Sequence, residues 1–312
     1  MTTKKHTLAI IIINYNSSGF TLKCINSLLQ HTDPTLNHEI IVVDNASEKE
    51  DYLFLKTALD KLQHPHLSLY RSRINTGFGG GNMFGVQFAK AQYYLFLNND
   101  TELKEDAISQ CLHFMESHPQ TAVCGPTIYN EFGEKQLGFD YFTSFGREAF
   151  GKKWVEWVHG KPNRRKAYQA PIAVDYVNGS FMLFRAKDFD RVGGFDTNIF
   201  LYYEESDICQ RLKQLGKDTH FIPTTSYVHY QGQSVKKTKM PLAIKMELKT
   251  SMFYVVKKHR GFFEYKALQC FFVLRYGLGS IIKPKNIALL RHILIGLPLS
   301  KSLKQKQQVT EV

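Results

Sequence analysis

The sequence predicts an α/β fold in which a mainly parallel β-sheet is covered by helices on both faces. Short runs of β-branched residues and leucine, typical of strands buried on both faces, alternate with segments whose apolar residues recur at helical spacing. This alternation is typical of strand–helix–strand units and therefore of parallel pairing. In addition, four strand ends are followed by loops rich in Asn, Asp, Ser or Gly, and ligands of such sheets bind at the carboxyl ends of the strands.

The first 130 residues contain the clearest elements. Residues 7–13 form a continuous run of Thr, Leu, Ala and Ile, which predicts a buried strand. The next segment places Phe20, Cys24 and Leu28 on one helical face, and Ser17 or Ser18 is the expected N-cap. The other elements that we expect are strands at 39–44, 67–71, 93–97 and 122–128, helices at 51–62 and 103–117, and a Gly-rich loop at 77–81 that leads into a helix ending near Lys90.

After about residue 130 the sequence changes character. Segment 130–170 is rich in Gly and aromatic residues, and we interpret it as an irregular insert over a cleft. The remaining predicted elements are a strand at 174–185 broken at Asn178-Gly179, a helix at 204–215, extended chain at 219–229, and helices at 242–258, 262–275 and 285–297.

Composition excludes several classes of protein. With 312 residues, of which 43% are hydrophobic and 22% charged, the chain can bury a core, so it is neither disordered nor fibrous. The five cysteines are dispersed without a C-x-x-C pair, which argues against a disulfide framework or a zinc site. The apolar run 8–13 is too short for a signal peptide, and Arg275 interrupts the longest apolar stretch, 267–282. We therefore expect a cytoplasmic protein and leave a peripheral position on the inner face of the cell membrane open.

The net charge of +12 suggests an anionic partner, but it is unevenly distributed. Residues 236–312 hold 16 Lys+Arg and 3 Asp+Glu, a net +13, so residues 1–235 carry −1. We therefore divide the chain into a region at 1–235 and a basic helical extension at 236–312. In the extension the basic residues alternate with large apolar ones, which suits an anionic membrane surface better than nucleic acid; the alternative is packing on the first region. These apolar residues are Phe262, Phe263, Phe271, Phe272, Ile293 and Leu294.

The Gly-rich segment Asn75-Thr76-Gly77-Phe78-Gly79-Gly80-Gly81-Asn82 is a candidate phosphate-binding loop. Its glycines remove Cβ atoms where a backbone approaches a ligand or takes positive φ, and it precedes a helix N-terminus, which favours anions. The segment has neither the G-x-G-x-x-G spacing nor the G-K-[ST] ending, so it supports neither a dinucleotide site nor a P-loop.

Three further sites carry carboxylates. Asp44 ends the second strand and could bind a base or a ribose, or only form an Asx-turn. Asp100 ends the fourth strand in Asn98-Asn99-Asp100; it could hold a divalent cation with His229 as second ligand, or again only form a turn. Glu204, Glu205 and Asp207 begin a helix, where they either compensate the helix dipole or supply a general base.

Taken together, these pieces resemble family 2 glycosyltransferases of the GT-A fold, in particular their bacterial rhamnosyltransferase-like branch. The resemblance covers about residues 5–235, and the order and spacing of its motifs are specific. The matching segments are Ile11–Asn16, Val42–Ser47, Asn75–Asn82, Leu97–Asp100, Asn178–Ser180, Val192–Asp196, Tyr203–Asp207 and His229–Ser234.

The resemblance implies a Rossmann-like sheet and an inverting transfer of a sugar, rhamnose or another hexose, from a dTDP- or UDP-linked donor to a saccharide or a lipid-linked oligosaccharide of the cell surface. It implies that Glu205 activates the acceptor with support from Glu204, and that Asp100 and His229 bind Mg²⁺ or Mn²⁺. The implied nucleotide-binding residues are Asn14, Tyr15, Asn16, Asp44, Asn75, Gly77, Gly80, Asn82 and Asn99. Gly179, Ser180 and Asp196 are implied at the donor sugar and the acceptor.

The sequence departs from the family pattern at two positions. The D-x-D motif is reduced to Asn98-Asn99-Asp100, so one carboxylate is missing. The base motif reads Glu-Glu rather than Glu-Asp, so Glu204 and Glu205 could exchange roles.

Two other functions compete with this one. A sugar nucleotidyltransferase is expected to carry Gly, Arg and Lys directly after the first strand, where this chain reads Asn14-Tyr15-Asn16-Ser17. A nucleic-acid-binding protein would explain the positive charge, but the apolar residues of the extension disfavour it.

Overall fold

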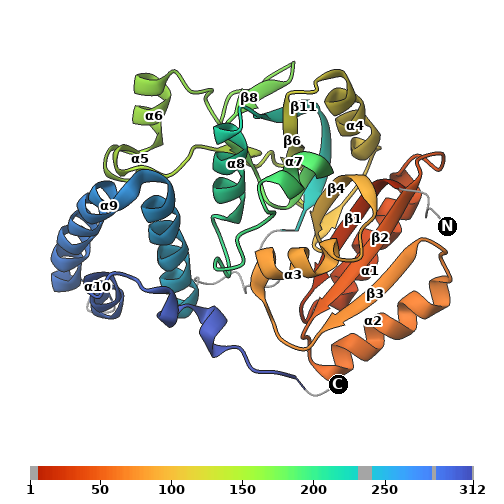
Figure 1. Ribbon diagram of the computed structural model, residues 1–312, viewed down its shortest axis with the longest axis horizontal. Coiled ribbons are helices and arrows are strands. Elements are labelled where there is room, and N and C mark those ends of the chain that lie inside the picture. Colours follow the sequence, from red (N-terminus) through yellow and green to blue (C-terminus); the bar gives the residue numbers. More distant parts are fainter. Residues whose placement is uncertain (1–5, 231–240, 283–285, 311–312) are drawn as a thin grey trace.

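The computed structural model (Figure 1) describes residues 6–230, 241–282 and 286–310. Its centre is a nine-stranded sheet of order β3-β2-β1-β4-β10-β6-β11-β5, with β8 paired to β11. The strands are β1 (His6–Asn14), β2 (His38–Asn45), β3 (Leu67–Ser72), β4 (Ala91–Asn98), β5 (Thr101–Glu102), β6 (Thr121–Tyr129), β8 (Ile172–Val174), β10 (Phe181–Arg185) and β11 (Asp218–His229). A separate two-stranded sheet pairs β7 (Phe139–Asp140) with β9 (Tyr176–Val177).

The sheet is mainly parallel, as predicted. β3, β2, β1 and β4 run in one direction, and so do β6 and β11. Three strands run in the opposite direction: β10 lies antiparallel between β4 and β6, and the short strands β5 and β8 each pair antiparallel with β11. Because β10 is reversed, its first residues lie at the same edge of the sheet as the last residues of β4, and Asn98 N–H donates to the carbonyl of Ser180. The segment Asn178–Ser180 thereby joins the loops that follow β1, β2 and β4.

Helices cover both faces because β1 presents alternate residues to opposite sides. Leu8, Ile10 and Ile12 pack with α1 (Ser18–His31), α2 (Lys49–Leu62) and α4 (Ala107–Ser117) in one apolar core. Ala9 and Ile11 face a second core, which includes residues of α7 (Ala186–Arg191) and α8 (Glu204–Gln214) and packs against α3 (Gly77–Val86). The predicted α/β sandwich is therefore confirmed.

Three local expectations are corrected. Ser17 is the N-cap residue of α1, but its side chain does not cap the helix; the Asp51 carboxylate accepts the Ser18 N–H at 3.1 Å instead. The helix predicted from residue 103 begins at Ala107, because Thr101–Glu102 pairs with β11 as strand β5. The insert 130–170 is only partly irregular, since it contains β7 and the helices α5 (Phe145–Phe150) and α6 (Lys152–His159).

The C-terminal helices α9 (Leu242–Ile282) and α10 (Asn286–Leu294) lie at one end of the molecule, at the left in Figure 1, beneath α5 and α6. Gly261, with φ of +82°, bends α9 between the two helices that the sequence predicts there. The chain then continues through the short 3₁₀ turns η1 (Leu299–Lys301) and η2 (Leu303–Lys306) to the end of β3. There Thr310 N–H donates to the carbonyl of Arg73, the residue after that strand, at 2.7 Å. No helix within the described ranges is long and apolar enough to cross a membrane. The predicted division at residue 235 lies outside the described residues.

Candidate active site

Asn14, the last residue of β1, links the loops at the sheet edge through its side-chain amide. Its Nδ2 group lies within hydrogen-bond distance of Asp44 Oδ1 (3.0 Å), Ser47 Oγ (3.1 Å) and Asp51 Oδ2 (2.9 Å). Its Oδ1 accepts from Thr21 at 2.8 Å. The side chain is fully buried, and its hydrogen bonds hold the loops that follow β1 and β2 in place.

Asp44, at the end of β2, is held from several sides. It is completely buried and receives hydrogen bonds from Asn14 and from the backbone of Ser47 at 3.3 Å. Arg71, at the end of β3, lies with Nε 3.4 Å from the carboxylate, and its guanidinium stacks over Tyr52 at 4.0 Å from the ring centroid. Sequence reasoning missed Arg71; the available signal was its position at a strand end beside Asp44.

The neighbouring loop residues Tyr15 and Asn16 are exposed, unlike Asn14. Asn16 has a left-handed backbone with φ of +49°, and its side-chain oxygen accepts from Glu48 N–H at 2.7 Å. The Asn16 N–H donates to Ser47 at 2.9 Å. The two loops that follow β1 and β2 are therefore joined by hydrogen bonds.

The Gly-rich segment is the first part of α3 rather than a loop before it. Asn45 holds its start, because its amide donates to Asn75 Oδ1 and to the Gly77 carbonyl, both at 3.1 Å. Gly77 has φ of +76°, and a Cβ there would lie 2.0 Å from the carbonyl oxygen of Phe200. The other glycines also face protein atoms: Cβ atoms on Gly80 and Gly81 would meet Thr76 and Ile13.

The close contacts of Gly77, Gly80 and Gly81 therefore pack α3 against the protein. Asn82 is also buried, and it donates to the Phe78 carbonyl at 3.1 Å. The sequence predicts that these glycines make room for a ligand. The structure shows instead that a Cβ at Gly77, Gly80 or Gly81 would collide with protein atoms.

Asp100 and His229 lie together, as the sequence predicts. His229 Nε2 is 3.1 Å from Asp100 Oδ1, and each side chain is about nine-tenths buried. Residue 229 meets this edge because β11 pairs with β5, where His229 lies opposite Thr101. Asn99 turns away and donates to Ser17 Oγ at 2.7 Å and to Thr21 at 2.8 Å.

The Asp100–His229 pair fits a divalent cation of the kind that keeps several waters and binds through few protein groups. The Nδ1 atom of His229 is buried without a hydrogen-bond partner among the described residues. Within those residues, no cluster of three or more His, Cys, Asp or Glu side chains could hold a metal. A cation here would therefore need ligands from water or substrate as well.

The N-terminus of α8 follows a strained turn. Tyr202 and Tyr203, neither of them glycine, have φ of +71° and +73°. Two consecutive left-handed residues cost free energy and persist only where the surroundings impose them. The turn directs Glu204 and Glu205 to different places: Glu204 is buried with its Cγ near Gly79 of α3, and Glu205 lines a cavity.

Both glutamates have raised pKa values. Burial raises the pKa of Glu204 well above its ordinary value, and the neighbouring Glu205, Glu247 and Asp207 raise it further. Burial also raises the pKa of Glu205, although hydrogen bonds from the backbone of Glu205, Gly179 and Tyr203 favour its charged form and offset part of the rise. A carboxylate with these properties, facing a cavity, suits proton abstraction.

Gly179 lies directly against Glu205. A Cβ on Gly179 would be 2.3 Å from Glu205 Oε1, so only glycine allows this approach. The next residue, Ser180, is buried and bonds Asn178 Oδ1 at 2.8 Å and the Tyr227 hydroxyl at 2.6 Å. The predicted residue Gly179 thus contacts the predicted base, whereas Ser180 supports the turn.

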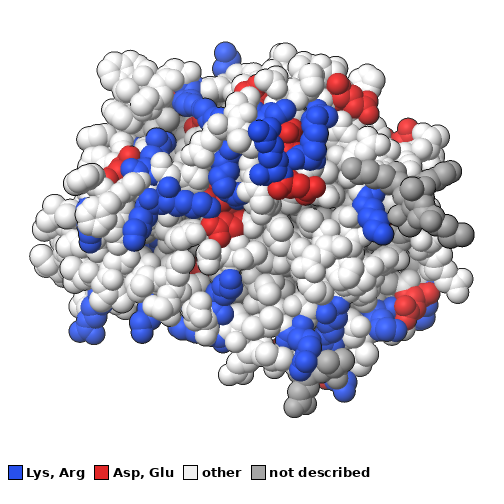
Figure 2. Space-filling view, viewed as in Figure 1, with Lys and Arg blue, Asp and Glu red and all other residues white. Residues whose placement is uncertain are grey.

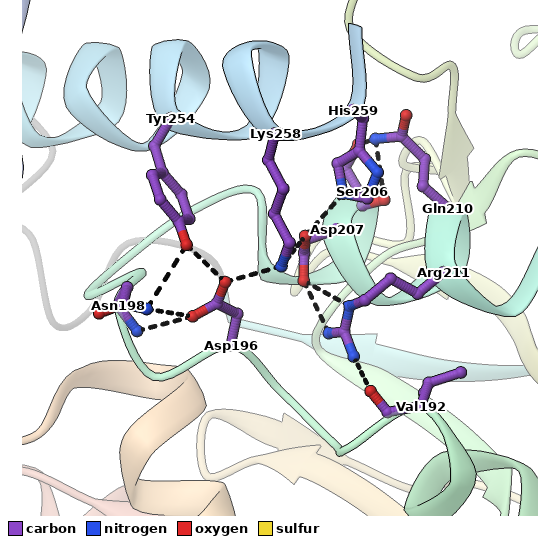
Figure 3. Close-up of polar contacts among 10 residues, drawn as sticks. All are labelled: Val192, Asp196, Asn198, Ser206, Asp207, Gln210, Arg211, Tyr254, Lys258 and His259. Atoms are coloured by element: carbon purple, nitrogen blue, oxygen red, sulfur yellow. Dashed lines mark hydrogen bonds and ion pairs between the residues drawn. The ribbon is translucent and has the colours of Figure 1, made fainter. Parts of the chain in front are cut away.

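Asp196 and Asp207 connect this region to α9 (Figure 3). Asp207 is fully buried and accepts from Arg211, from His259 Nε2 at 2.7 Å and from Lys258 Nζ at 2.7 Å. Burial alone would raise the pKa of Asp207, but these partners lower it to about 2. Asp196 accepts from the same Lys258 at 2.7 Å and from Tyr254 at 2.8 Å. Sequence reasoning missed Lys258 and His259, and no local signal marks them.

The cavity beside Glu205 has a volume of about 500 Å³. Its walls come from β7, β9, the two helices of the insert and the turn before α8, and Leu248 of α9 also lines it. The residues that line the cavity include three cations: Arg147, Lys152 and Arg164. The sequence predicts a cleft under the insert, but not its cationic lining.

Comparison with known proteins relates this architecture to enzymes of sugar transfer. The profile of the family described as Glycosyl transferase family 2 matches residues 9–193. The chain is 26% identical over 258 residues to Rhamnosyltransferase WbbL of Escherichia coli K12, covering 80% of this chain and 92% of the relative. It is 22% identical over 322 residues to N-acetylglucosaminyl-diphospho-decaprenol L-rhamnosyltransferase of Mycobacterium tuberculosis H37Rv, covering 97% and 98%.

Solved structures share the fold at lower sequence identity. A crystal structure of GalNAc-T7 with UDP, GalNAc and Mn²⁺ superposes with a TM-score of 0.59 at 15% identity, over 81% of this chain and 48% of that one. S. aureus TarS superposes with a TM-score of 0.53 at 15% identity, over 84% and 42%. The chain therefore spans under half of these two solved chains and nearly the whole of the two bacterial relatives.

Proposed function

The chain belongs to glycosyl transferase family 2, and from this premise we propose that it is an inverting hexosyltransferase that uses a nucleotide-diphosphate sugar. The acceptor is a hydroxyl of a saccharide or of a lipid-linked oligosaccharide. The observation that carries this proposal is the position of Glu205, which faces a 500 Å³ cavity while Glu204 is buried behind it. Because a substrate in the cavity could reach Glu205 but not Glu204, we assign Glu205 as the base and Glu204 as a supporting residue.

In the proposed reaction, the acceptor oxygen attacks the anomeric carbon of the donor sugar as the bond from that carbon to the diphosphate oxygen breaks. The acceptor proton passes to the Glu205 carboxylate, and the electron pair of the broken bond leaves with the nucleoside diphosphate. The raised pKa of Glu205 supports this role, because a base is most effective when its pKa lies near the working pH. Attack from the face opposite the leaving group inverts the anomeric configuration.

On the donor side, we place the nucleotide at the loops that follow β1, β2 and β4. Asp44, held by Asn14 and Arg71, would accept hydrogen bonds from the base or the ribose, and the exposed Tyr15 and Asn16 would border that pocket. Asp100 and His229 would hold Mg²⁺ or Mn²⁺, which supplies charge stabilisation to a leaving diphosphate. The two bacterial rhamnosyltransferases among the relatives support a rhamnosyl donor, and we propose dTDP or UDP as its nucleotide.

The test is transfer by purified full-length protein. The assay offers a panel of dTDP- and UDP-sugars and measures released nucleoside diphosphate with and without candidate saccharide acceptors. We expect one donor to be consumed with inversion at the anomeric carbon, and Glu205→Gln to lower kcat by roughly 10²-fold or more while donor affinity is kept. Near-normal turnover by Glu205→Gln would remove Glu205 from this role.

We further propose that the C-terminal helices hold the enzyme against the cytoplasmic face of an anionic membrane. Of the six apolar residues considered from sequence, Phe272 and Ile293 are buried in the core of α9 and α10, and Phe271 packs partly buried against it. The other three, Phe262, Phe263 and Leu294, are exposed. The second half of α9 has an exposed stripe at helical spacing, formed by Phe263, Ala267, Cys270, Leu274, Leu278 and Ile281. Figure 2 shows Lys and Arg side chains along the lower left edge of the molecule, near α9 and α10.

Vesicle co-sedimentation of the full chain tests this placement. We expect binding to vesicles containing phosphatidylglycerol and weaker binding to pure phosphatidylcholine, because both apolar burial and charge contribute. The double variant Leu274→Glu/Leu278→Glu should lose binding. Phe54→Glu, at an exposed apolar position of α2, is the matched control. Equal binding by both variants would contradict the proposal.

A further inference from the structure

The cavity beside Glu205 contains more positive than negative charge. Arg147 Nη2 lies 3.0 Å and Arg164 Nη1 3.2 Å from the Asp140 carboxylate, and Lys152 is bonded to the same carboxylate. Arg147 also pairs with Glu148 at 3.1 Å, on the side of α5. Asp140 and Glu205 are the two carboxylates among the residues that line the cavity, against three cations.

The two arginines are buried without full use of their donors. Arg147 is about nine-tenths buried, and the Nε atoms of both Arg147 and Arg164 are buried without a hydrogen-bond partner in the described part of the chain. Burial of a guanidinium with an unsatisfied N–H costs free energy. An anion in the cavity would balance the charge of these cations, and planar guanidinium groups match the oxygens of a phosphate.

The position of Glu205 indicates that the acceptor, rather than the donor, carries that anion. In an in-line displacement the attacking oxygen and the leaving diphosphate lie on opposite sides of the anomeric carbon. In the proposed reaction Glu205 receives the proton of the attacking oxygen. The cavity that Glu205 lines together with Arg147, Lys152 and Arg164 therefore lies on the side of the attacking acceptor. Asp44 and Asp100, the candidate donor residues, do not line this cavity.

We propose that the cavity is the acceptor subsite and that Arg147, Lys152 and Arg164 bind a phosphate or diphosphate group carried by the acceptor beside its reactive hydroxyl. This inference rests on the proposed function. It makes the enzyme selective for sugar phosphoesters over neutral glycosides, because the cations contribute binding energy that a neutral acceptor does not use.

The test compares two acceptors that differ only in charge, an alkyl glycosyl diphosphate and the alkyl glycoside of the same sugar. The variant is Lys152→Gln, which removes one cation while Arg147, with its structural bonds to Thr143 and Glu148, is kept. The matched control is Lys153→Gln, the exposed neighbour in α6. Donor hydrolysis without acceptor is measured in parallel.

We expect the wild type to prefer the diphosphate acceptor by at least tenfold in kcat/KM. Lys152→Gln should raise KM for that acceptor about tenfold and leave the neutral acceptor, the donor KM and donor hydrolysis unchanged. Arg164→Gln should act in the same direction. Lys153→Gln should match the wild type.

Three results would overturn the proposal: equal use of both acceptors by the wild type, an unchanged KM in both cavity variants, or a rise in the donor KM instead, which would assign the cations to the donor. If the wild type consumes no nucleotide sugar from the panel, the proposed function itself fails. Binding of the alkyl glycosyl diphosphate to the wild type and to Lys152→Gln, compared with binding of the neutral alkyl glycoside, then still tests the anion site separately.

Discussion

Lys258 of α9 and Asp207 of α8 form an ion pair with 2.7 Å between Nζ and Oδ1, and the same ammonium lies 2.7 Å from Asp196. Asp207 is two residues from Glu205, so this contact attaches the C-terminal helices to the element that carries the candidate base (Figure 3). His259 and Arg211 also bond to Asp207.

Removal of the Lys258 ammonium should therefore affect both stability and turnover. We expect Lys258→Met to lower the free energy of unfolding by about 1–2 kcal/mol, because two carboxylates lose a charged partner. It should also lower kcat several-fold through displacement of α8. Urea unfolding and steady-state kinetics measure these effects. Lys257→Met is the matched control, since Lys257 contacts the Tyr265 ring. Wild-type kcat in Lys258→Met would show that α9 does not position the site.

Glu204 should destabilise the protein at neutral pH. Its folded-state pKa lies above the ordinary value, so its contribution to stability is fully present below that ordinary value and is lost as pH rises through the raised pKa. Glu204→Gln, which is neutral at every pH, should have a higher Tm than the wild type at pH 7.5 and a similar Tm at pH 4. Thermal unfolding across this range tests the sign. Glu116→Gln, on the exposed side of α4, should show no such pH dependence. A lower Tm for Glu204→Gln at pH 7.5 would contradict the prediction.

The pH dependence of activity should report Glu205. A base works only when deprotonated, and burial raises the pKa of this carboxyl above 4.5. As the pH is lowered, kcat/KM should therefore decline with a midpoint above the ordinary pKa of a glutamate. A profile measured from pH 4 to pH 9 gives the midpoint. Full activity at pH 4.5 would be incompatible with Glu205 as a base of raised pKa.

A single methyl group on Gly179 should disturb Glu205. The added Cβ would lie 2.3 Å from Glu205 Oε1, so the carboxylate must move. We expect Gly179→Ala to lower kcat by at least tenfold, because misplacement of a catalytic group by about 1 Å is costly. Gly19→Ala is the control, since a Cβ there meets nothing within 4 Å. Unchanged kcat in Gly179→Ala would mean that the position of this carboxylate does not limit the reaction.

Metal removal should abolish transfer if Asp100 and His229 bind the cation. We expect EDTA to stop the reaction and Mn²⁺ or Mg²⁺ to restore it in the wild type. Asp100→Ala should not be restored at the same metal concentration. Calorimetry with a nucleoside diphosphate, with and without Mn²⁺, gives a readout independent of activity. Persistent activity in EDTA together with tolerance of both Asp100→Ala and His229→Ala would exclude this role.

Much of the fold could be predicted because strands and helices carry their signal within a few residues. The apolar runs predict β1, β2, β3, β4 and β6 within one or two residues at each end. The strand-end rule pointed to Asp100, and the sequence offered His229 as a candidate second ligand beside it; the structure places the two side chains 3.1 Å apart. The different burial of Glu204 and Glu205 was not predictable from the sequence, because it depends on packing against α3 and the insert.

From the amino-acid sequence we could predict the alternation of strands and helices, the polar loops at the strand ends and the basic character of the C-terminal segment. Three features became visible only in the folded chain: β10 runs antiparallel, Arg147, Lys152 and Arg164 share Asp140 beside Glu205, and Lys258 binds Asp207. The physical reason is the range of the interactions. Periodicity reports which face of one element is buried, whereas an ion pair between residues 51 positions apart exists only when separate elements have packed together.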